Sequence, residues 1–439
     1  MSVIARTPRA VPASSPSDPR YFDATDLEAE LRRTFQVCHE CRMCVNYCGS
    51  FPELFARVDR DIDSGKSEGA EAIDDADMRV VSDKCWQCKL CYVKCPYTKD
   101  DGATELLDFP RLMAREKAAR AARDGVSFVD QVLGEPQLVG RLGSGPTSVV
   151  SNFVHASRLL RKVQEKLTGV SAEFPLPRFA SETFPAWFEK HQPAASAGER
   201  GEVVLFATCT GNYNTPQIPR ATVRVLEHLG YRVSRVEETC CGMPNLDGGD
   251  VTSFIAKIRA NVALLLPHVA RGAKVLVPQP TCAYTLKREW YEYVAEDDVR
   301  AVASASFDLM EFIEQHRRKL GLPAAEVGLG QVAYHAACHL RAQKIGFPAA
   351  RVLERGLPAT QVQIVQECSA VDGTWGMKAE HYEEGRHYAQ RLVSAVEAAE
   401  PDVVVTDCSL SAMRLQKETG RDAIHPVQAL ARAWGLEET

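Results

Sequence analysis

Two stretches of this sequence share one cysteine spacing: residues 38–48 read CHECRMCVNYC, and residues 85–96 read CWQCKLCYVKCP. In each stretch four cysteines follow the pattern C-x2-C-x2-C-x3-C. Thiolate sulfur is the soft ligand that iron–sulfur clusters select, and three cysteines on one tight loop reach three corners of a cubic cluster. The doubled spacing therefore predicts two [4Fe–4S] clusters.

The spacing also indicates which cysteines share a cluster. The same run occurs in bacterial ferredoxins with two clusters, where the fourth cysteine of each run ligates the other cluster. On this pattern one cluster is held by Cys38, Cys41, Cys44 and Cys95, and the other by Cys85, Cys88, Cys91 and Cys48. Zinc sites typically show two C-x-x-C pairs, and disulfide frameworks are typical of short secreted chains, so both alternatives fit the runs less well.

The composition is that of an ordinary globular protein, with 45% hydrophobic and 25% charged residues in 439. This length predicts two or three domains. The net charge of −6 leaves no basic footprint for nucleic acid, so no nucleic-acid partner is expected. The sequence contains neither a spanning apolar run nor a signal-peptide core. The 15 cysteines are therefore expected in a reducing compartment. The cytoplasm is the predicted location, with peripheral contact on the inner face of the cell membrane left open.

The chain divides into five segments by composition and pattern. Residues 1–20 are rich in Pro, Ser and Ala and are expected to form a disordered arm. Residues 21–130 hold both cysteine runs, and residues 131–200 form a helical connector and linker. Two duplicated domains follow, at residues 201–325 and 326–439.

One stretch of the connector has a clear helical period, because apolar residues recur at alternating spacings of three and four. This stripe consists of Val149, Phe153, Ala156, Leu160, Val163 and Leu167, and the basic residues off the stripe are Arg158, Arg161, Lys162 and Lys166. Two interpretations stay open. The helix packs against its own protein, or it docks as a basic amphipathic helix on an anionic membrane surface or a partner.

From residue 202 onward the chain repeats itself at a nearly constant offset. The run EVVLFATC at 202–209 matches QVAYHAAC at 331–338, and similar matches join ETCCG at 238–242 with QECSA at 366–370 and KVLVPQPTC at 274–282 with DVVVTDC at 402–408. Such self-similarity indicates duplication. Each half alternates short β-branched runs with helical patterns, which predicts a parallel sheet with helices on both faces.

The predicted fold class is therefore α+β, with an N-terminal α-helical dicluster domain followed by two duplicated α/β cysteine-rich domains. In the first repeat, strands are expected over 203–207, 232–236 and 275–277, and helices over 216–229, 252–269 and 284–294.

The remaining seven cysteines respect the repeat. The first repeat holds Cys209, Cys240, Cys241 and Cys282, and the second holds Cys338, Cys368 and Cys408. They fall where strands end and loops begin, which is the edge at which open α/β sheets bind ligands. Four thiolates suit either a [4Fe–4S] cluster or a zinc ion, whereas three need a further ligand. A disulfide between the adjacent Cys240 and Cys241 is disfavoured in a reducing compartment.

The cysteine pattern resembles the cysteine-rich CCG domain of the heterodisulfide reductase family. The matching stretches are CTGNYN at 209–214, CCGMP at 240–244, YHAACHL at 334–340, GTWGMK at 373–378 and VVVTDC at 403–408. That family includes the iron–sulfur C subunits of anaerobic glycerol-3-phosphate dehydrogenases and the iron–sulfur subunits of glycolate and lactate oxidation. The resemblance implies that the two ferredoxin-type clusters relay electrons. It also implies a further metal centre in the cysteine-rich halves, near a quinone or disulfide acceptor.

The chain departs from the five-cysteine family motif, because Thr285, Ser369 and Ser411 stand where cysteines are expected. The non-cubane cluster of the family is therefore not expected. An ordinary cluster or zinc is predicted instead, with a non-cysteine fourth ligand in the second repeat. His339, next to Cys338, is the first candidate for that ligand, and His335 is the second.

No dinucleotide fingerprint follows a strand, so the chain is expected to handle single electrons while a partner performs the two-electron chemistry. The predicted function is an iron–sulfur electron-transfer subunit. It would take electrons from a flavoprotein dehydrogenase and pass them through two [4Fe–4S] clusters to a cysteine-rich-domain centre, and on to a quinone or small redox protein. Three alternatives remain: a disulfide or heterodisulfide reductase with a catalytic cluster, a redox partner of a rubrerythrin-like protein, and a scaffold whose second repeat holds zinc.

Overall fold

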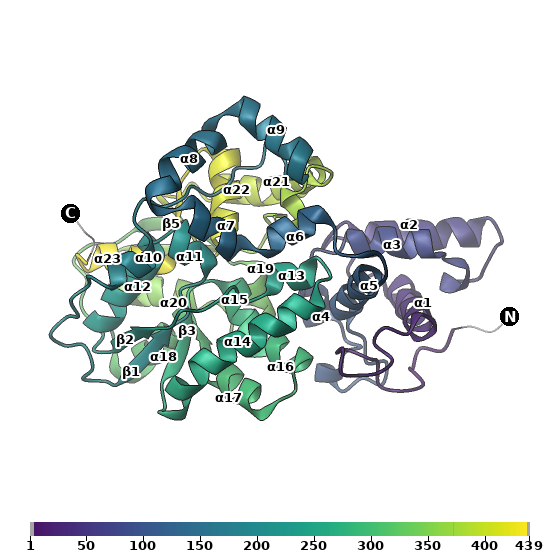
Figure 1. Ribbon diagram of the computed structural model, residues 1–439, viewed down its shortest axis with the longest axis horizontal. Helices are drawn as coiled ribbons and strands as arrows, with labels where there is room; N and C mark the ends of the chain where they lie inside the picture. The colour runs from purple at the N-terminus through teal and green to yellow at the C-terminus, as the bar shows by residue number, and fades with distance from the viewer. Residues whose placement is uncertain (1–3, 372, 437–439) are drawn as a thin grey trace.

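The computed structural model describes residues 4–371 and 373–436. Its N-terminal domain is helical and lies at one end of the molecule (Figure 1). The α-helices of this domain are α1 (Ala24–Cys41), α2 (Ser50–Asp63), α3 (Asp75–Asp83), α4 (Leu90–Lys94) and α5 (Phe109–Asp124), with 3₁₀ turns η1 (Ala70–Ala72) and η2 (Lys99–Asp101). The side chains of Asp23, Asp74 and Asp108 accept hydrogen bonds from the first turns of α1, α3 and α5, which fixes where these helices begin.

Residues 4–20 differ from the expected disordered arm, because they lie against the folded chain. The Ala13 side chain is buried, and Ser15 Oγ donates a hydrogen bond to the Tyr293 carbonyl at 2.9 Å. A Pro-, Ser- and Ala-rich segment forms no helix or strand of its own over these described residues, yet its polar groups still bond to a neighbouring domain.

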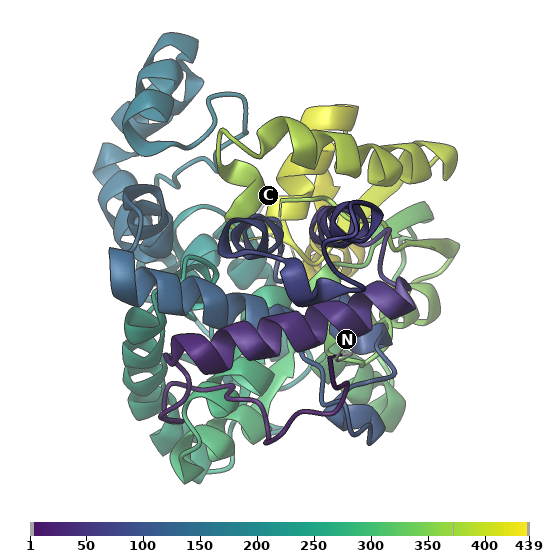
Figure 2. The same cartoon turned by 90° about the vertical axis from the view of Figure 1, so that its right-hand side faces the viewer.

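The connector consists of short helices in place of one long one. They are α6 (Phe128–Gly134), α7 (Pro136–Gly143), η3 (Gly145–Thr147), α8 (Ser148–Ala156), α9 (Arg158–Thr168) and α10 (Phe184–Phe188). Ser157 divides the expected amphipathic stripe, because its backbone is extended and its side chain caps α9 at Leu160 N. Figure 1 shows α8 and α9 at the outer edge of the molecule, and Figure 2 shows them from the side of the N-terminal domain.

The first repeat contains a parallel four-stranded sheet in the order β2-β1-β3-β4. Its strands are β1 (Glu202–Leu205), β2 (Arg232–Arg235), β3 (Lys274–Val277) and β4 (Ser306–Asp308). The helices are α11 (Cys209–Tyr213), α12 (Gln217–His228), α13 (Met243–Asp247), α14 (Val251–Ala270), α15 (Pro280–Tyr284), α16 (Trp290–Tyr293), α17 (Asp297–Ala305) and α18 (Leu309–Leu320). The three expected strands lie within two residues of their expected bounds, and β4 is an addition that the pattern did not predict. The helix expected over 284–294 is interrupted by η4, a π-helical turn over Thr285–Glu289.

The second repeat has the same topology, with the strand order β6-β5-β7-β8 and every pairing parallel. Its strands are β5 (Gly330–His335), β6 (Thr360–Val365), β7 (Val403–Thr406) and β8 (Ala423–Ile424). The helices are α19 (Cys338–Ala342), α20 (Pro348–Gly356), η5 (Trp375–Met377), α21 (Tyr382–Ala398), α22 (Ser409–Thr419) and α23 (Pro426–Ala433). The shared strand order confirms the predicted fold class of a helical N-terminal domain followed by two duplicated α/β domains.

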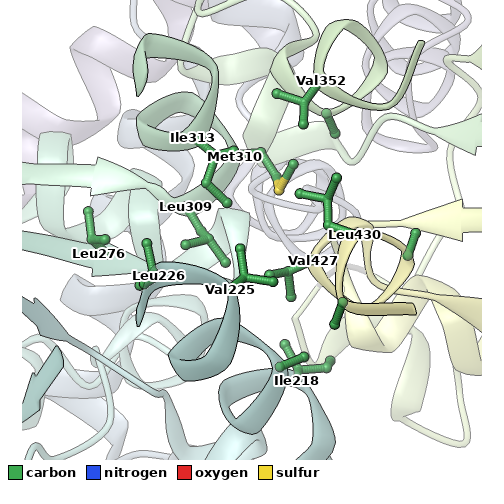
Figure 3. Close-up of a cluster of buried hydrophobic side chains, with 14 of the residues drawn as sticks. Ile218, Val225, Leu226, Leu276, Leu309, Met310, Ile313, Val352, Val427 and Leu430 are labelled. Atoms are coloured by element: carbon green, nitrogen blue, oxygen red, sulfur yellow. The ribbon is translucent and has the colours of Figure 1, made fainter. Parts of the chain in front are cut away.

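The two repeats share one hydrophobic core. Figure 3 shows Val225 of α12 beside Val427 of α23, with Met310 of α18 above them. Most of these side chains are fully buried, so each repeat covers apolar surface that the other would otherwise expose to water. The N-terminal domain is joined in the same way, because Ala370 and Trp375 of the second repeat belong to its core. Among the described residues no helix has the length and apolarity that crossing a bilayer requires.

Candidate metal centres

The structure gathers the eight cysteines of the two runs into two groups, each around a small cavity. Cys38, Cys41, Cys44 and Cys95 line one cavity, and Cys48, Cys85, Cys88 and Cys91 line the other. These are the sets that the spacing assigns to two clusters, with the fourth cysteine of each run crossing to the other group. All eight cysteines are present as thiols and not as disulfides.

The electrostatics of these thiols fit a positively charged inorganic core. Burial raises the pKa of Cys38 well above its usual range, and neighbouring Cys95, Cys44 and Cys41 raise it further. Burial likewise raises the pKa of Cys91, with Cys85 and Cys48 adding to the effect. Four buried thiolates repel one another unless cations stand between them, and iron ions supply that charge in a cluster.

The two groups of cysteines are neighbours. Phe51 lines both cavities, is buried, and packs its ring 4.6 Å from that of Phe109. A single aromatic side chain therefore forms part of the wall between the two candidate cluster sites.

The loop of the second run is held in an unusual conformation. Gln87 and Lys89 both have positive φ, at 56° and 63°, which few residues other than glycine adopt. Gln87 Nε2 donates to the Pro110 carbonyl at 2.9 Å and to Cys85 Sγ at 3.4 Å. These bonds tie the loop to α5 and to the side chain of Cys85.

A buried ion cluster anchors this loop to the first repeat. Lys89 Nζ lies 3.0 Å from Glu289 Oε1, and Arg111 Nη1 lies 3.3 Å from Glu289 Oε2. Burial opposes the ionisation of Glu289, but the charges of Lys89 and Arg111 outweigh it and hold its pKa at about 2. The sequence pattern did not reveal this cluster, because its members are separated by about 200 positions and belong to different domains.

The first repeat brings its four cysteines together at the carboxyl edge of its sheet. They follow β1, β2 and β3, and hydrogen bonds link their thiols in the order Cys209, Cys240, Cys241, Cys282. Hydrogen bonds from Cys209 and Cys241 hold the pKa of Cys240 well below its usual range. The result is a row of adjacent sulfur atoms, which are soft ligands that suit soft metal ions.

The backbone around these thiols is closely packed. Gly242 has a φ of 91°, and a Cβ there would lie 2.5 Å from the Phe254 ring, so only glycine fits directly after the cysteine pair. Trp290 Nε1 donates to the Cys241 carbonyl at 3.0 Å. Within residues 4–371 and 373–436, no three His, Cys, Asp or Glu side chains converge as a single bound ion requires.

Two cysteines of the second repeat, Cys368 and Cys408, lie in different surroundings. Cys368 Sγ accepts a hydrogen bond from Ala370 N at 3.3 Å and packs against the N-terminal core. Cys408 instead lines a cavity that it shares with the cysteines of the first repeat. Ser369 and Ser411, which stand where the family motif has cysteines, are hydrogen-bonded to each other at 2.9 Å.

His339 makes two hydrogen bonds in the structure, and its role as a metal ligand stays a prediction. His339 Nε2 donates to the Gln87 carbonyl at 3.1 Å, and Nδ1 accepts from the Thr281 hydroxyl at 3.0 Å. Burial lowers its pKa to about 4, so the ring is neutral. Both nitrogens are hydrogen-bonded, and the histidine joins the second cysteine run to the first turn of α15, the helix that holds Cys282.

A cavity of about 240 Å³ lies between the two repeats and the connector. Five cysteines line it, Cys209, Cys240, Cys241, Cys282 and Cys408, and so do the apolar side chains Leu133, Val139, Phe179, Met243 and Leu410. The connector packs closely here, since a Cβ on Gly140 would lie 2.8 Å from Tyr213, and one on Gly143 would lie 2.6 Å from Phe179. The sequence analysis did not predict this role of the connector, for which Gly140 and Gly143 were a possible signal.

Comparison with known proteins identifies the family to which the two repeats are similar. The family model "Cysteine-rich domain" (CCG) matches residues 203–287 and 332–416. The chain is 27% identical over 329 residues to the C subunit of the anaerobic glycerol-3-phosphate dehydrogenase of Escherichia coli, covering 72% of this chain and 80% of that protein. It is 23% identical over 402 residues to the "Glycolate oxidase iron-sulfur subunit" of the same organism, covering 88% and 90%. "Lactate utilization protein A" of an Exiguobacterium species is 30% identical over 192 residues, covering 40% and 74%.

Proposed function

This chain belongs to the family defined by the cysteine-rich CCG domain, as an iron–sulfur subunit of oxidoreductase complexes, and we propose that it carries electrons from a flavoprotein dehydrogenase to a membrane quinone. Two [4Fe–4S] clusters held by the two cysteine groups of the N-terminal domain would receive the electrons. Clusters of this kind exchange one electron at a time. The four cysteines of the first repeat would hold a third cluster, from which the electrons leave.

One observation carries this proposal: a short hydrogen-bonded route connects the second cysteine run with the thiols of the first repeat. The Gln87 carbonyl, within the loop from Cys85 to Cys88, accepts from His339. His339 in turn accepts from Thr281, which precedes Cys282. Two hydrogen bonds thus connect one candidate cluster site with the next. They join the N-terminal domain to the second repeat and the second repeat to the first.

The cavity beside the first-repeat thiols suits an apolar acceptor. Its wall is largely apolar, and apolar pockets with a few convergent polar groups are typical small-molecule sites. A disulfide reductase would need the five-cysteine cradle of the family. Here Ser369 and Ser411 form a hydrogen bond in place of two of those ligands, which disfavours that alternative.

The connector provides a surface for a bilayer, the phase in which quinones dissolve. Val149, Phe153 and Leu167 are 76%, 66% and 69% exposed, so the stripe does not pack against its own protein. The cationic side chains Arg158, Lys162 and Lys166 are exposed on the same helices. Exposed apolar side chains beside cations are typical of helices that lie on anionic membranes. His155 and Gln164 of α8 and α9 also line the cavity, so this face adjoins the proposed quinone site.

Anaerobic purification with iron and sulfide analysis tests the proposal. Three clusters correspond to about twelve iron atoms per chain, and two to about eight. Chemically reduced protein mixed with a short-chain ubiquinone should lose its reduced-cluster signal in paramagnetic resonance as quinol forms. Colourless protein without iron, or reduced protein that turns over disulfides but not quinone, would contradict the proposal.

A further inference from the structure

A second cavity, of about 320 Å³, lies between the N-terminal domain and the second repeat, and its walls are charged. Lys117 and Arg120 of α5 line it from one side, and Lys378 and His381 from the other. Side chains at its rim are open to solvent, as Glu380 shows with 70% of its side chain exposed. The charged cavity is thus accessible to water and protons.

Only Asp247 and Thr374, among the described residues, line both the charged cavity and the apolar cavity beside the cysteines. Asp247 ends α13, the short helix that begins directly after Cys241 and Gly242. Thr374 is buried and belongs to the second repeat. These two polar side chains form a common wall between water and the proposed quinone site.

The Asp247 side chain is partly buried, and one of its two carboxylate oxygens is fully shielded from solvent. Its Oδ1 atom is shielded from solvent and has no hydrogen-bond partner in the part of the chain that the structure describes. A Cβ on Gly373 would lie 2.5 Å from Asp247 Oδ2, so the glycine leaves the space that the carboxyl group occupies. An unpaired buried oxygen costs free energy, which is typical of functional positions.

Charged groups from several elements surround Asp247. Burial raises its pKa to about 7, while Lys117, Lys89 and Lys378 oppose the rise and Glu289 adds to it. The effect of Lys378 is reduced, because its Nζ lies 2.8 Å from Asp130 Oδ1. The carboxyl group therefore exchanges a proton near neutral pH, which is what a proton donor in this range requires.

We propose that Asp247 delivers protons from the charged cavity to the quinone bound in the apolar cavity, with Thr374 beside it in the shared wall. This inference rests on the proposed function. Reduction of a quinone to a quinol adds two electrons to the ring and one proton to each of its two oxygens. The electrons come from the clusters, and each proton passes from the Asp247 carboxyl group, which regains one from water in the charged cavity.

The test compares Asp247→Asn with the unchanged full-length protein, both loaded with clusters and reduced by dithionite. Asparagine keeps the size of the side chain but carries no transferable proton. The matched control is Asp124→Asn, because Asp124 lines the charged cavity but not the apolar cavity. Two oxidants are used: a short-chain ubiquinone, which needs protons, and ferricyanide, which takes single electrons and needs none. Infrared difference spectra between low and high pH report the carboxylic-acid band of Asp247 independently of turnover.

Asp247→Asn should slow quinone reduction by about 100-fold, the usual contribution of a positioned acid, and leave the ferricyanide rate unchanged. The quinone rate of the unchanged protein should fall as the pH rises through 7, and the carboxylic-acid band that titrates there should be missing in the variant. Equal quinone rates in the variant and the unchanged protein, or a band that persists in the variant, would overturn the role of Asp247 while leaving the proposed function intact. Failure of the unchanged protein to reduce quinone, with normal ferricyanide rates, would overturn both.

Discussion

The buried ion cluster at Glu289 leads to a quantitative prediction for Glu289→Gln. The change keeps the shape of the side chain, but it removes the counter-charge that lies 3.0 Å from the buried Lys89 and leaves Arg111 with Asp108, at 3.1 Å, in place of two carboxylate partners. Removing one partner from a buried pair is strongly destabilising, because the remaining charges lose compensation. The buried ion cluster joins the second cysteine run, α5 and the first repeat. Its loss should therefore weaken the contact between the N-terminal domain and the first repeat.

The magnitude follows from the pKa of Glu289. The pKa is about 2 in the folded protein, against an ordinary value of 4.5. Each unit is worth about 1.4 kcal/mol, so the charged carboxylate contributes about 3 kcal/mol to the free energy of unfolding. Because the folded pKa is depressed, this contribution is complete above pH 4.5 and disappears as the pH falls towards 2. The loss of about 3 to 5 kcal/mol that is typical of broken buried pairs agrees with this value.

Anaerobic urea unfolding at pH 7, followed by tryptophan fluorescence and by the visible absorbance of the clusters, measures the change as a shift of the midpoint. The control is Glu182→Gln. Glu182 pairs with Lys190 and Arg220 at the surface, where 40% of its side chain is exposed. This substitution should change the free energy of unfolding by less than about 1 kcal/mol. The double variant Arg111→Met/Glu289→Gln should recover part of the loss. Equal midpoint shifts for Glu289→Gln and Glu182→Gln would refute the claim that the buried ion cluster stabilises the fold.

Three further predictions concern the relay and the membrane face. Phe153→Glu should weaken binding to anionic vesicles in flotation assays by about tenfold or more, since an apolar side chain contributes about 1.5 to 3 kcal/mol, whereas Leu320→Glu, also exposed but on α18, should leave binding unchanged. His339→Ala should retain all iron, because the ring nitrogens bond to Thr281 and Gln87, but should slow re-oxidation of the N-terminal clusters by quinone; a loss of iron would support His339 as a ligand. Cys282→Ser should lower iron by about four atoms per chain, whereas Cys368→Ser, whose thiol packs against the N-terminal core, should lower it by none.

Sequence spacing anticipated the parts of this protein that depend on neighbouring residues. Three cysteines at intervals of three lie close together in any conformation, so the spacing alone groups Cys38, Cys41 and Cys44, although the structure places Cys38 and Cys41 in the last turn of α1 and not in a loop. The duplication predicted the parallel sheets in the same way, since alternating strands and helices leave few topologies. Element boundaries were less certain at the π-helical turn over Thr285–Glu289, where an apolar period continues although the hydrogen bonds change.

The sequence pattern left alternatives open where a residue's surroundings come from other domains. His339 beside a cysteine is compatible with a ligand, and only the positions of Gln87 and Thr281 reveal that both nitrogens are hydrogen-bonded. The connector stripe is compatible with a packed helix, and only the exposure of Phe153 and Leu167 distinguishes a packed face from an open one.

What the sequence determined by itself is the chemistry: which thiols form groups, and which fold displays them. The tertiary structure decided the environment of that chemistry. This environment comprises the buried ion cluster at Glu289, the apolar cavity between the repeats, and the wall between the two cavities that Asp247 and Thr374 form. The physical reason is that ligand type and spacing are local properties of the chain. Burial, charge compensation and access to water depend on groups far apart in sequence, and only folding brings those groups together.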